Sequence, residues 1–167
     1  HTYEFGEQLG GGEFSKVYLV KHKKSGEDLA IKILDYHFLM QRLEKENQED
    51  SKRKFDEIKK RFLMEVSLYE KIQHPNIVKI YDTGFIEERE KDLEVPYFVM
   101  SYIRGSSLAG ILREKGKIEP PQAIAWTRNI LSALQAIHEE KIVHRDLKPA
   151  NVMTDEGTGE AIIIDFG

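Results

Sequence analysis

The stretch HRDLKPAN, residues 144–151, places a carboxylate, a lysine and a carboxamide in one short, turn-rich segment. The carboxylate of Asp146 suits a group that orients a hydroxyl and accepts its proton. The carboxamide oxygen of Asn151 suits a hard cation such as Mg²⁺, which prefers oxygen ligands. The pattern alone leaves a second interpretation open, namely a polar turn stabilised by local pairs.

Two further segments carry candidate chemistry. The stretch LGGGEFSKV, residues 9–17, joins two predicted strands, and Gly10 and Gly12 would let the backbone approach a phosphate and direct its N–H groups at it. A glycine-rich turn between strands is also typical of a plain hairpin. Asp165 directly follows three isoleucines. It is interpreted either as a metal ligand or as a turn residue at the end of a strand.

Two charged residues interrupt apolar patterns. Lys32 lies inside the apolar strand predicted over residues 29–34, and Glu65 lies inside the apolar stripe of a later helix. The stripe consists of Phe55, Ile58, Phe62, Tyr69 and Ile72. An ionised carboxylate facing a core is costly unless a cation meets it, so we expect Glu65 to pair with Lys32. The alternative is that each side chain reaches solvent at an edge.

The composition of the chain excludes several classes of protein. The 167 residues, 40% of them hydrophobic, suffice for one domain or two small lobes. The net charge of −4 gives no basic field for nucleic acid, and the lack of cysteine excludes disulfides, as in a reducing compartment. No apolar run approaches the roughly 20 residues of a membrane helix. We therefore expect a cytoplasmic protein without a membrane segment in this chain, or the cytosolic part of a larger or membrane-tethered protein.

The order of predicted elements separates two parts. Strands are predicted over 3–34, 77–82 and 97–103, and the polar residues 104–107 indicate a boundary between lobes. Ser106 or Ser107 is expected to cap a short helix, and Pro120-Pro121 is expected to open a longer one. The apolar face of that longer helix is Ile124, Thr127, Ile130, Leu131, Leu134, Ile137 and His138.

Taken in order, these segments resemble the motifs of the eukaryotic-like (Hanks-type) serine/threonine protein kinases. The matching residues are Gly10-x-Gly12-x-x-Ser15-x-Val17, Leu29-Ala30-Ile31-Lys32, Glu65, residues 144–151 and Asp165-Phe166-Gly167. Segments 80–84 and 99–103 look most like the bacterial branch. The resemblance implies an α+β, protein-kinase-like bilobal fold. Residues 1–103 would form an N-lobe with an antiparallel sheet, one regulatory helix and an insertion near 36–54, and residues 104–167 a partial, mainly helical C-lobe.

The resemblance also implies the function and its site. The implied reaction is transfer of the γ-phosphate of ATP to serine or threonine hydroxyls of proteins, with Mg²⁺ as cofactor and no role for nucleic acid. The implied catalytic residues are Asp146, Lys148, Lys32 and Glu65, and the implied metal ligands are Asn151 and Asp165. The implied ATP contacts are Gly10, Gly11, Gly12, Glu13, Phe14, Ser15, Val17, Ala30, Lys32, Met100, Ser101, Ile103 and Met153. Lys148 in particular marks the serine/threonine class.

Three features depart from the family pattern. Ser15 replaces the third glycine, the stretch between Lys32 and Glu65 is long, and the sequence stops at Asp165-Phe166-Gly167. We therefore expect a part of a longer polypeptide, inactive alone and with an apolar face exposed on its long helix. We also expect Tyr69, Ile80, Phe166 and His144 to stack as one apolar column. The alternative functions are a nucleotide-binding pseudokinase and a small-molecule phosphotransferase of related fold.

Overall fold

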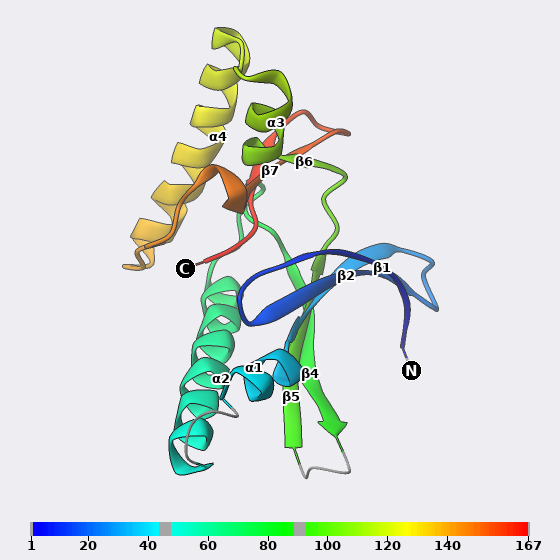
Figure 1. Ribbon diagram of the computed structural model, residues 1–167. Helices are drawn as coiled ribbons and strands as arrows, with labels where there is room; N and C mark the ends of the chain where they lie inside the picture. The colour runs from blue at the N-terminus through cyan, green and yellow to red at the C-terminus, as the bar shows by residue number, and fades with distance from the viewer. Residues whose placement is uncertain (1, 44–47, 89–92, 167) are drawn as a thin grey trace. The chain divides into compact units, whose positions relative to one another are not determined.

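The computed structural model describes residues 2–43, 48–88 and 93–166, which fold as two compact units (Figure 1). The first unit comprises the residues up to Ser67 and Ile80–Tyr102, and the second comprises Leu68–Lys79 and the residues from Ile103 onward. An antiparallel sheet with helices in the first unit, and helices with a small sheet in the second, confirm the predicted α+β kinase-like fold.

The first unit is built on a five-stranded antiparallel sheet with strand order β1-β2-β3-β5-β4. Its strands are β1 (Tyr3–Gly11), β2 (Ser15–His22), β3 (Asp28–Leu34), β4 (Ile80–Glu88) and β5 (Leu93–Ser101). Side chains alternate between the two faces of a strand. One face therefore carries a buried apolar cluster of Val20, Leu29, Ile31 and Val99.

The opposite face of this sheet carries four of the predicted nucleotide contacts. Val17 pairs with Lys32 across β2 and β3, and Ala30 pairs with Met100 across β3 and β5, so these four side chains share one face. The long helix α2 (Gln48–Lys71) runs beside the sheet (Figure 1). Because its apolar stripe needs a partner, it packs on this face, with the ring centroids of Phe62 and Phe98 5.3 Å apart.

The insertion predicted near 36–54 folds partly as a second helix of the first unit, α1 (Tyr36–Leu43). The backbone N–H of Phe38 donates to Asp35 Oδ1 at 3.2 Å, which satisfies a donor at the start of the helix. Leu39 is fully buried, and Tyr36 packs edge-on against Phe55 of α2. The first unit therefore contains two helices in place of the single one expected. Helix α1 forms because it has its own N-terminal cap and a buried side chain, Leu39.

The second unit combines two α-helices with a three-stranded sheet of order β6-β7-β8. Its elements are β6 (Gly105–Ser107), α3 (Leu108–Lys115), α4 (Pro120–Glu139), the 3₁₀-helix η1 (Pro149–Asn151), β7 (Val152–Asp155) and β8 (Ala161–Ile163). Ser107 caps α3 as expected, accepting from the Gly110 N–H at 3.1 Å. Helix α4 is tied to the sheet where Asn129 Oδ1 accepts from the Ala161 N–H at 3.1 Å.

The buried face of α4 is narrower than its apolar stripe. Ala133 and Ile137 are fully buried, whereas Ile124 and Leu131, which were assigned to the same face, are 55% and 58% exposed. The expected exposure of apolar surface on this helix is confirmed. The physical reason is that β8 and its neighbours cover only the side of the helix centred on Ala133 and Ile137. In the described part of the chain, no helix combines the length and apolar character needed to span a bilayer.

The segment after α2 belongs with the second unit. The sequence predicts a single boundary between the two parts, after residue 103, and therefore places this segment in the first part. The Val78 N–H donates to Ile163 O and the Ile163 N–H donates to Asn76 O, each at 2.9 Å. Asn76 Nδ2 also donates to Ala161 O at 3.1 Å. Residues 76–78 are therefore bonded along β8, a long-range pairing that local sequence patterns do not reveal.

Gly105 allows β6 to pair with β7. Its φ is +155°, and a Cβ added there would lie 1.9 Å from Thr154 O. We expect Gly105→Ala to lower the free energy of unfolding by about 2–6 kcal/mol, through backbone strain plus a steric clash. Gly116→Ala is the matched control, because φ is +72° but no atom lies within 4 Å of the added Cβ. Urea unfolding of both variants checks this, and equal losses would contradict it.

Candidate active site

The glycine-rich turn between β1 and β2 has one glycine that its own fold requires and two that it does not. A Cβ at Gly11 would lie 2.6 Å from Ser15 O, close to where the Gly12 N–H donates to that same oxygen at 3.0 Å. A Cβ at Gly10 would meet nothing within 4 Å, and one at Gly12 only Ser15 Oγ at 3.6 Å. Packing within the described chain therefore does not explain Gly10 and Gly12, whereas close approach of a ligand would.

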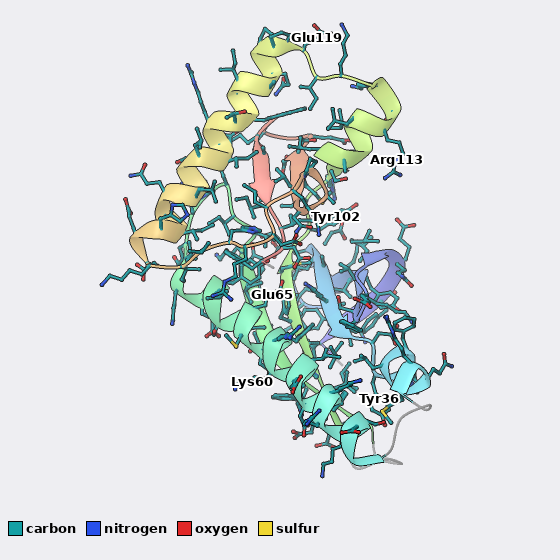
Figure 2. The ribbon with its side chains drawn as sticks, turned by 60° about the vertical axis from the view of Figure 1, so that its left-hand side comes forward. Tyr36, Lys60, Glu65, Tyr102, Arg113 and Glu119 are labelled. Atoms are coloured by element: carbon teal, nitrogen blue, oxygen red, sulfur yellow. The ribbon has the colours of Figure 1, made fainter. Side chains whose placement is uncertain are left out.

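Lys32 and Glu65 form the predicted ion pair. Lys32 Nζ lies 2.8 Å from Glu65 Oε1 and 2.9 Å from Oε2, and each side chain is only 11% exposed. Figure 2 shows Glu65 on the side of α2 that faces the sheet. Lys32 Nζ also lies 5.6 Å from the ring centroid of Phe98. The pairing expected from the interrupted apolar patterns is confirmed, and it fixes an ammonium group on the sheet face that carries Val17, Ala30 and Met100.

Asp146 is the centre of a hydrogen-bonded loop in the second unit. Lys148 Nζ donates to Asp146 Oδ2 at 2.5 Å, and Asn151 Nδ2 donates to the same oxygen at 3.1 Å. The Asp146 side chain remains 45% exposed. The Lys148 ammonium, followed by the Asn151 amide, lowers the pKa of the Asp146 carboxyl despite some desolvation. The loop therefore presents an ionised, accessible carboxylate at neutral pH.

Backbone geometry holds this loop in shape. Arg145 has a positive φ of 64°, and the Asp146 N–H donates to His144 O at 2.8 Å, so the chain turns sharply before the carboxylate. Asn151 is buried in η1 and its Nδ2 also donates to Asp146 O at 2.9 Å. Local pairs thus do stabilise a polar turn, as the alternative interpretation held, and the same pairs set the direction of the Asp146 and Asn151 side chains.

The side-chain oxygens of Asn151 and Asp165 suit a magnesium ion whose other ligands are water and the phosphate oxygens of a bound molecule. The Asn151 amide nitrogen is used as a donor to Asp146, which turns the carboxamide oxygen toward other partners. The Ile164 N–H donates to Asn151 O at 3.0 Å, which brings the next residue, Asp165, close to it. Among the described residues no group of three or more His, Cys, Asp or Glu side chains is arranged as a metal site. Mg²⁺ commonly takes one or two protein oxygens together with water and phosphate oxygens, so this small donor set suits it.

Three of the four residues of the expected apolar column meet within the second unit. The ring centroids of His144 and Phe166 are 5.0 Å apart and nearly parallel, and those of Tyr69 and Phe166 are 4.8 Å apart, edge to face. Tyr69 also donates its hydroxyl to Ile164 O at 2.8 Å. Ile80 belongs to the first unit. Its place in the column stays a prediction.

The predicted site residues divide between the units. The first unit holds residues 10–15, Val17, Ala30, Lys32, Glu65, Met100 and Ser101, and the second holds Ile103, Asp146, Lys148, Asn151, Met153 and Asp165. Met153 lies in β7, where it pairs with Ser107 of β6. Sequence reasoning gave no role to Asp35 or Arg42. Both contact the glycine-rich turn, and no local pattern predicts these contacts because their partners lie elsewhere in the chain.

Comparison with known proteins identifies the family to which this chain belongs. Residues 3–167 match the family model described as protein kinase domain, and the chain belongs to this family. It is 34% identical over 165 residues to a Corynebacterium efficiens protein named probable serine/threonine-protein kinase, and 34% identical over 171 residues to serine/threonine-protein kinase PknB of Mycobacterium leprae. It is 32% identical over 165 residues to CBL-interacting serine/threonine-protein kinase 19 of Arabidopsis thaliana.

Each of these alignments covers 99% of this chain but only 22%, 24% and 30% of the respective relative. The chain thus spans less than a third of the length of these curated relatives. The predicted membership in the serine/threonine protein kinase family is confirmed, and bacterial members are among its relatives, as the sequence indicated.

His144 should make stability depend on pH. Burial lowers its pKa below the usual 6.5, although Asp165 and Asp146 oppose the shift. Below pH 6.5 the unfolded chain therefore takes up a proton that the folded chain does not, and the free energy of unfolding falls by at most about 1.4 kcal/mol per pH unit from this group. At pH 8 both states carry the neutral ring, and this dependence vanishes.

Urea unfolding from pH 8 to pH 5.5, in buffer with a chelator, measures this effect against His144→Phe, which keeps an aromatic ring beside Phe166. The variant should gain stability relative to the parent as the pH falls. Parallel pH profiles for the two proteins would contradict the prediction.

Proposed function

We propose that this domain, within its longer protein, transfers the γ-phosphate of ATP to serine or threonine hydroxyls of protein substrates. The observation that carries the proposal is the Asp146 loop, in which a half-exposed carboxylate is held by Lys148 and Asn151. Membership in the protein kinase family and the names of the relatives support the same reaction.

Asp146 would orient the attacking hydroxyl. Its lowered pKa keeps the carboxylate ionised, so it accepts a hydrogen bond from the hydroxyl and directs the oxygen lone pair at the phosphorus. A carboxylate of low pKa is a weak base for a free alcohol. The proton therefore moves to Asp146 only as the new bond to phosphorus forms, which makes the hydroxyl acidic, while the bond between the γ-phosphorus and the bridging oxygen breaks and ADP leaves.

Lys148 has two tasks in this proposal. It fixes Asp146 from one side, at 2.5 Å, and it brings a positive charge to the place where the γ-phosphate would be transferred. A fixed cation next to developing negative charge stabilises the transition state more than the ground state. This is the residue on which the assignment to the serine/threonine class rests.

The first unit would bind the nucleotide. The N–H groups of residues 10–15 would bind phosphate oxygens in the space that Gly10 and Gly12 leave open, and Lys32, oriented by Glu65, would bind the α- and β-phosphates. The apolar face formed by Val17, Ala30 and Met100 would contact the adenine, together with Met153. Backbone groups of Ser101 and Ile103 would bind its edge.

Asn151 and Asp165 would hold Mg²⁺ through their side-chain oxygens. When bound, the ion would neutralise phosphate charge and align the γ-phosphate. Asn151 is pre-oriented for this, because its amide nitrogen is bound to Asp146. A pseudokinase, one of the two alternative functions, is disfavoured by the presence of Asp146, Asn151 and Asp165 together with relatives named as kinases.

Asp146→Asn should lower turnover by about 10²–10⁴ while leaving ATP affinity nearly unchanged, because the amide cannot accept the hydroxyl proton. Steady-state phosphorylation of a generic protein acceptor and calorimetric ATP binding, both on the full-length protein, measure the two effects. Glu114→Gln, an exposed change on α3, is the control and should be neutral. Undiminished turnover in Asp146→Asn would contradict the assignment of Asp146 as the group that accepts the hydroxyl proton.

ATP affinity should depend on Mg²⁺, because Asn151 and Asp165 offer oxygen ligands but no positive charge of their own. Titration of ATP into the full-length protein, with Mg²⁺ and with excess chelator, should show much weaker binding without the metal. Asp165→Asn should reduce that difference. Equal affinities in the two buffers would instead indicate a metal-independent nucleotide-binding module.

A further inference from the structure

Helix α1 is bonded to the glycine-rich turn through Asp35. The Asp35 N–H donates to Phe14 O at 2.9 Å, and its carboxylate both caps α1 and lies 2.8 Å from Lys16 Nζ at the start of β2. The Asp35 side chain is largely buried. The base of α1 and the base of the turn are therefore one connected, hydrogen-bonded structure.

The last turn of α1 reaches the tip of the same glycine-rich turn. The guanidinium of Arg42 forms an ion pair with Glu13 and lies 5.9 Å from the ring centroid of Phe14. The charged groups of Arg42 and Glu13 are more than half exposed. Such a pair contributes little to global stability, so its effect would be confined to the turn and the helix end that it joins.

Phe14, at the tip of the turn, borders an open cavity. Phe14, Leu39 and Arg42 line a cavity of about 340 Å³, whose remaining walls come from α2. A turn above open space retains freedom to move, because few packed atoms oppose its displacement. The bonds from Asp35 and Arg42 are therefore well placed to set its position.

We propose that α1 is a positioning element for the glycine-rich turn, and that Arg42 favours binding of nucleotide phosphates by holding Phe14 and neutralising Glu13. Glu13 lies in the turn that would bind the phosphates, where an unpaired carboxylate would repel them. This inference rests on the proposed nucleotide-binding role of residues 10–15. It assigns a function to the inserted helix, and it makes Arg42 a positioning residue that acts through Glu13.

The charge argument predicts a phosphate-specific effect. In the full-length protein, Arg42→Ala should weaken Mg·ATP binding about two- to fivefold, the range of an exposed ion pair, and leave adenosine binding unchanged. Arg42→Lys should retain most of the affinity. Adding Glu13→Ala to Arg42→Ala should recover part of the lost ATP affinity, because the repelling carboxylate is then gone while the contact of Arg42 with Phe14 is still missing. Arg53→Ala is the control, since this exposed arginine pairs with Asp50 on α2.

Calorimetry with Mg·ATP and with adenosine gives these affinities, and hydrogen–deuterium exchange of residues 10–15 without nucleotide tests the restraint directly. Faster exchange of the turn in Arg42→Ala than in Arg53→Ala supports the proposal. Equal ATP affinities in Arg42→Ala and the parent, or an equal loss for ATP and adenosine, would overturn it. A parent protein that binds no Mg·ATP at all would overturn the proposed function and the phosphate effect together, while unchanged exchange would overturn the restraint alone.

Discussion

The ion pair between Lys32 and Glu65 organises the first unit. Two charges that are each only 11% exposed have lost most of their hydration, and their mutual contact at 2.8 and 2.9 Å compensates for much of that loss. Removing one partner would leave an unpaired buried charge, at a cost of about 3–5 kcal/mol. Helix α2 therefore has one favourable rotation on the sheet, with Glu65 over β3 and Phe62 against Phe98.

The second unit also buries an ionisable side chain, a histidine, and this side chain is neutral. His144 is buried against Phe166, and burial lowers its pKa, so the ring packs as an uncharged aromatic. Its chain neighbour Arg145 adopts a positive φ, and the next residue, Asp146, turns toward Lys148 and Asn151. A packed ring and an exposed carboxylate thus lie two positions apart in one loop. This anchors the candidate catalytic group to the apolar column of Phe166 and Tyr69.

Much of this arrangement could be predicted from the sequence at positions where a charged residue interrupts an apolar pattern and so requires a partner. A lysine in an apolar strand and a glutamate in an apolar helix stripe each required a partner, and the structure pairs them. A serine cap at Ser106 or Ser107 was also recognisable, since a hydroxyl before an apolar run can satisfy backbone donors, and the structure shows that the cap is Ser107. The exposure of Ile124 and Leu131 was less visible, because an amphipathic stripe does not reveal how much of it a neighbouring sheet covers.

The sequence by itself determined the chemical groups and their order: a glycine-rich turn, a lysine and a glutamate that each interrupt an apolar pattern, and a loop with Asp146 and Asn151. It could do so because each group follows from residue type and local spacing. The tertiary structure alone decided that Arg42 meets Glu13, 29 residues away, and that Tyr69 bonds Ile164 O, 95 residues away. These contacts depend on how separate elements pack. Local periodicity carries no information on which distant exposed charge or carbonyl a side chain will reach.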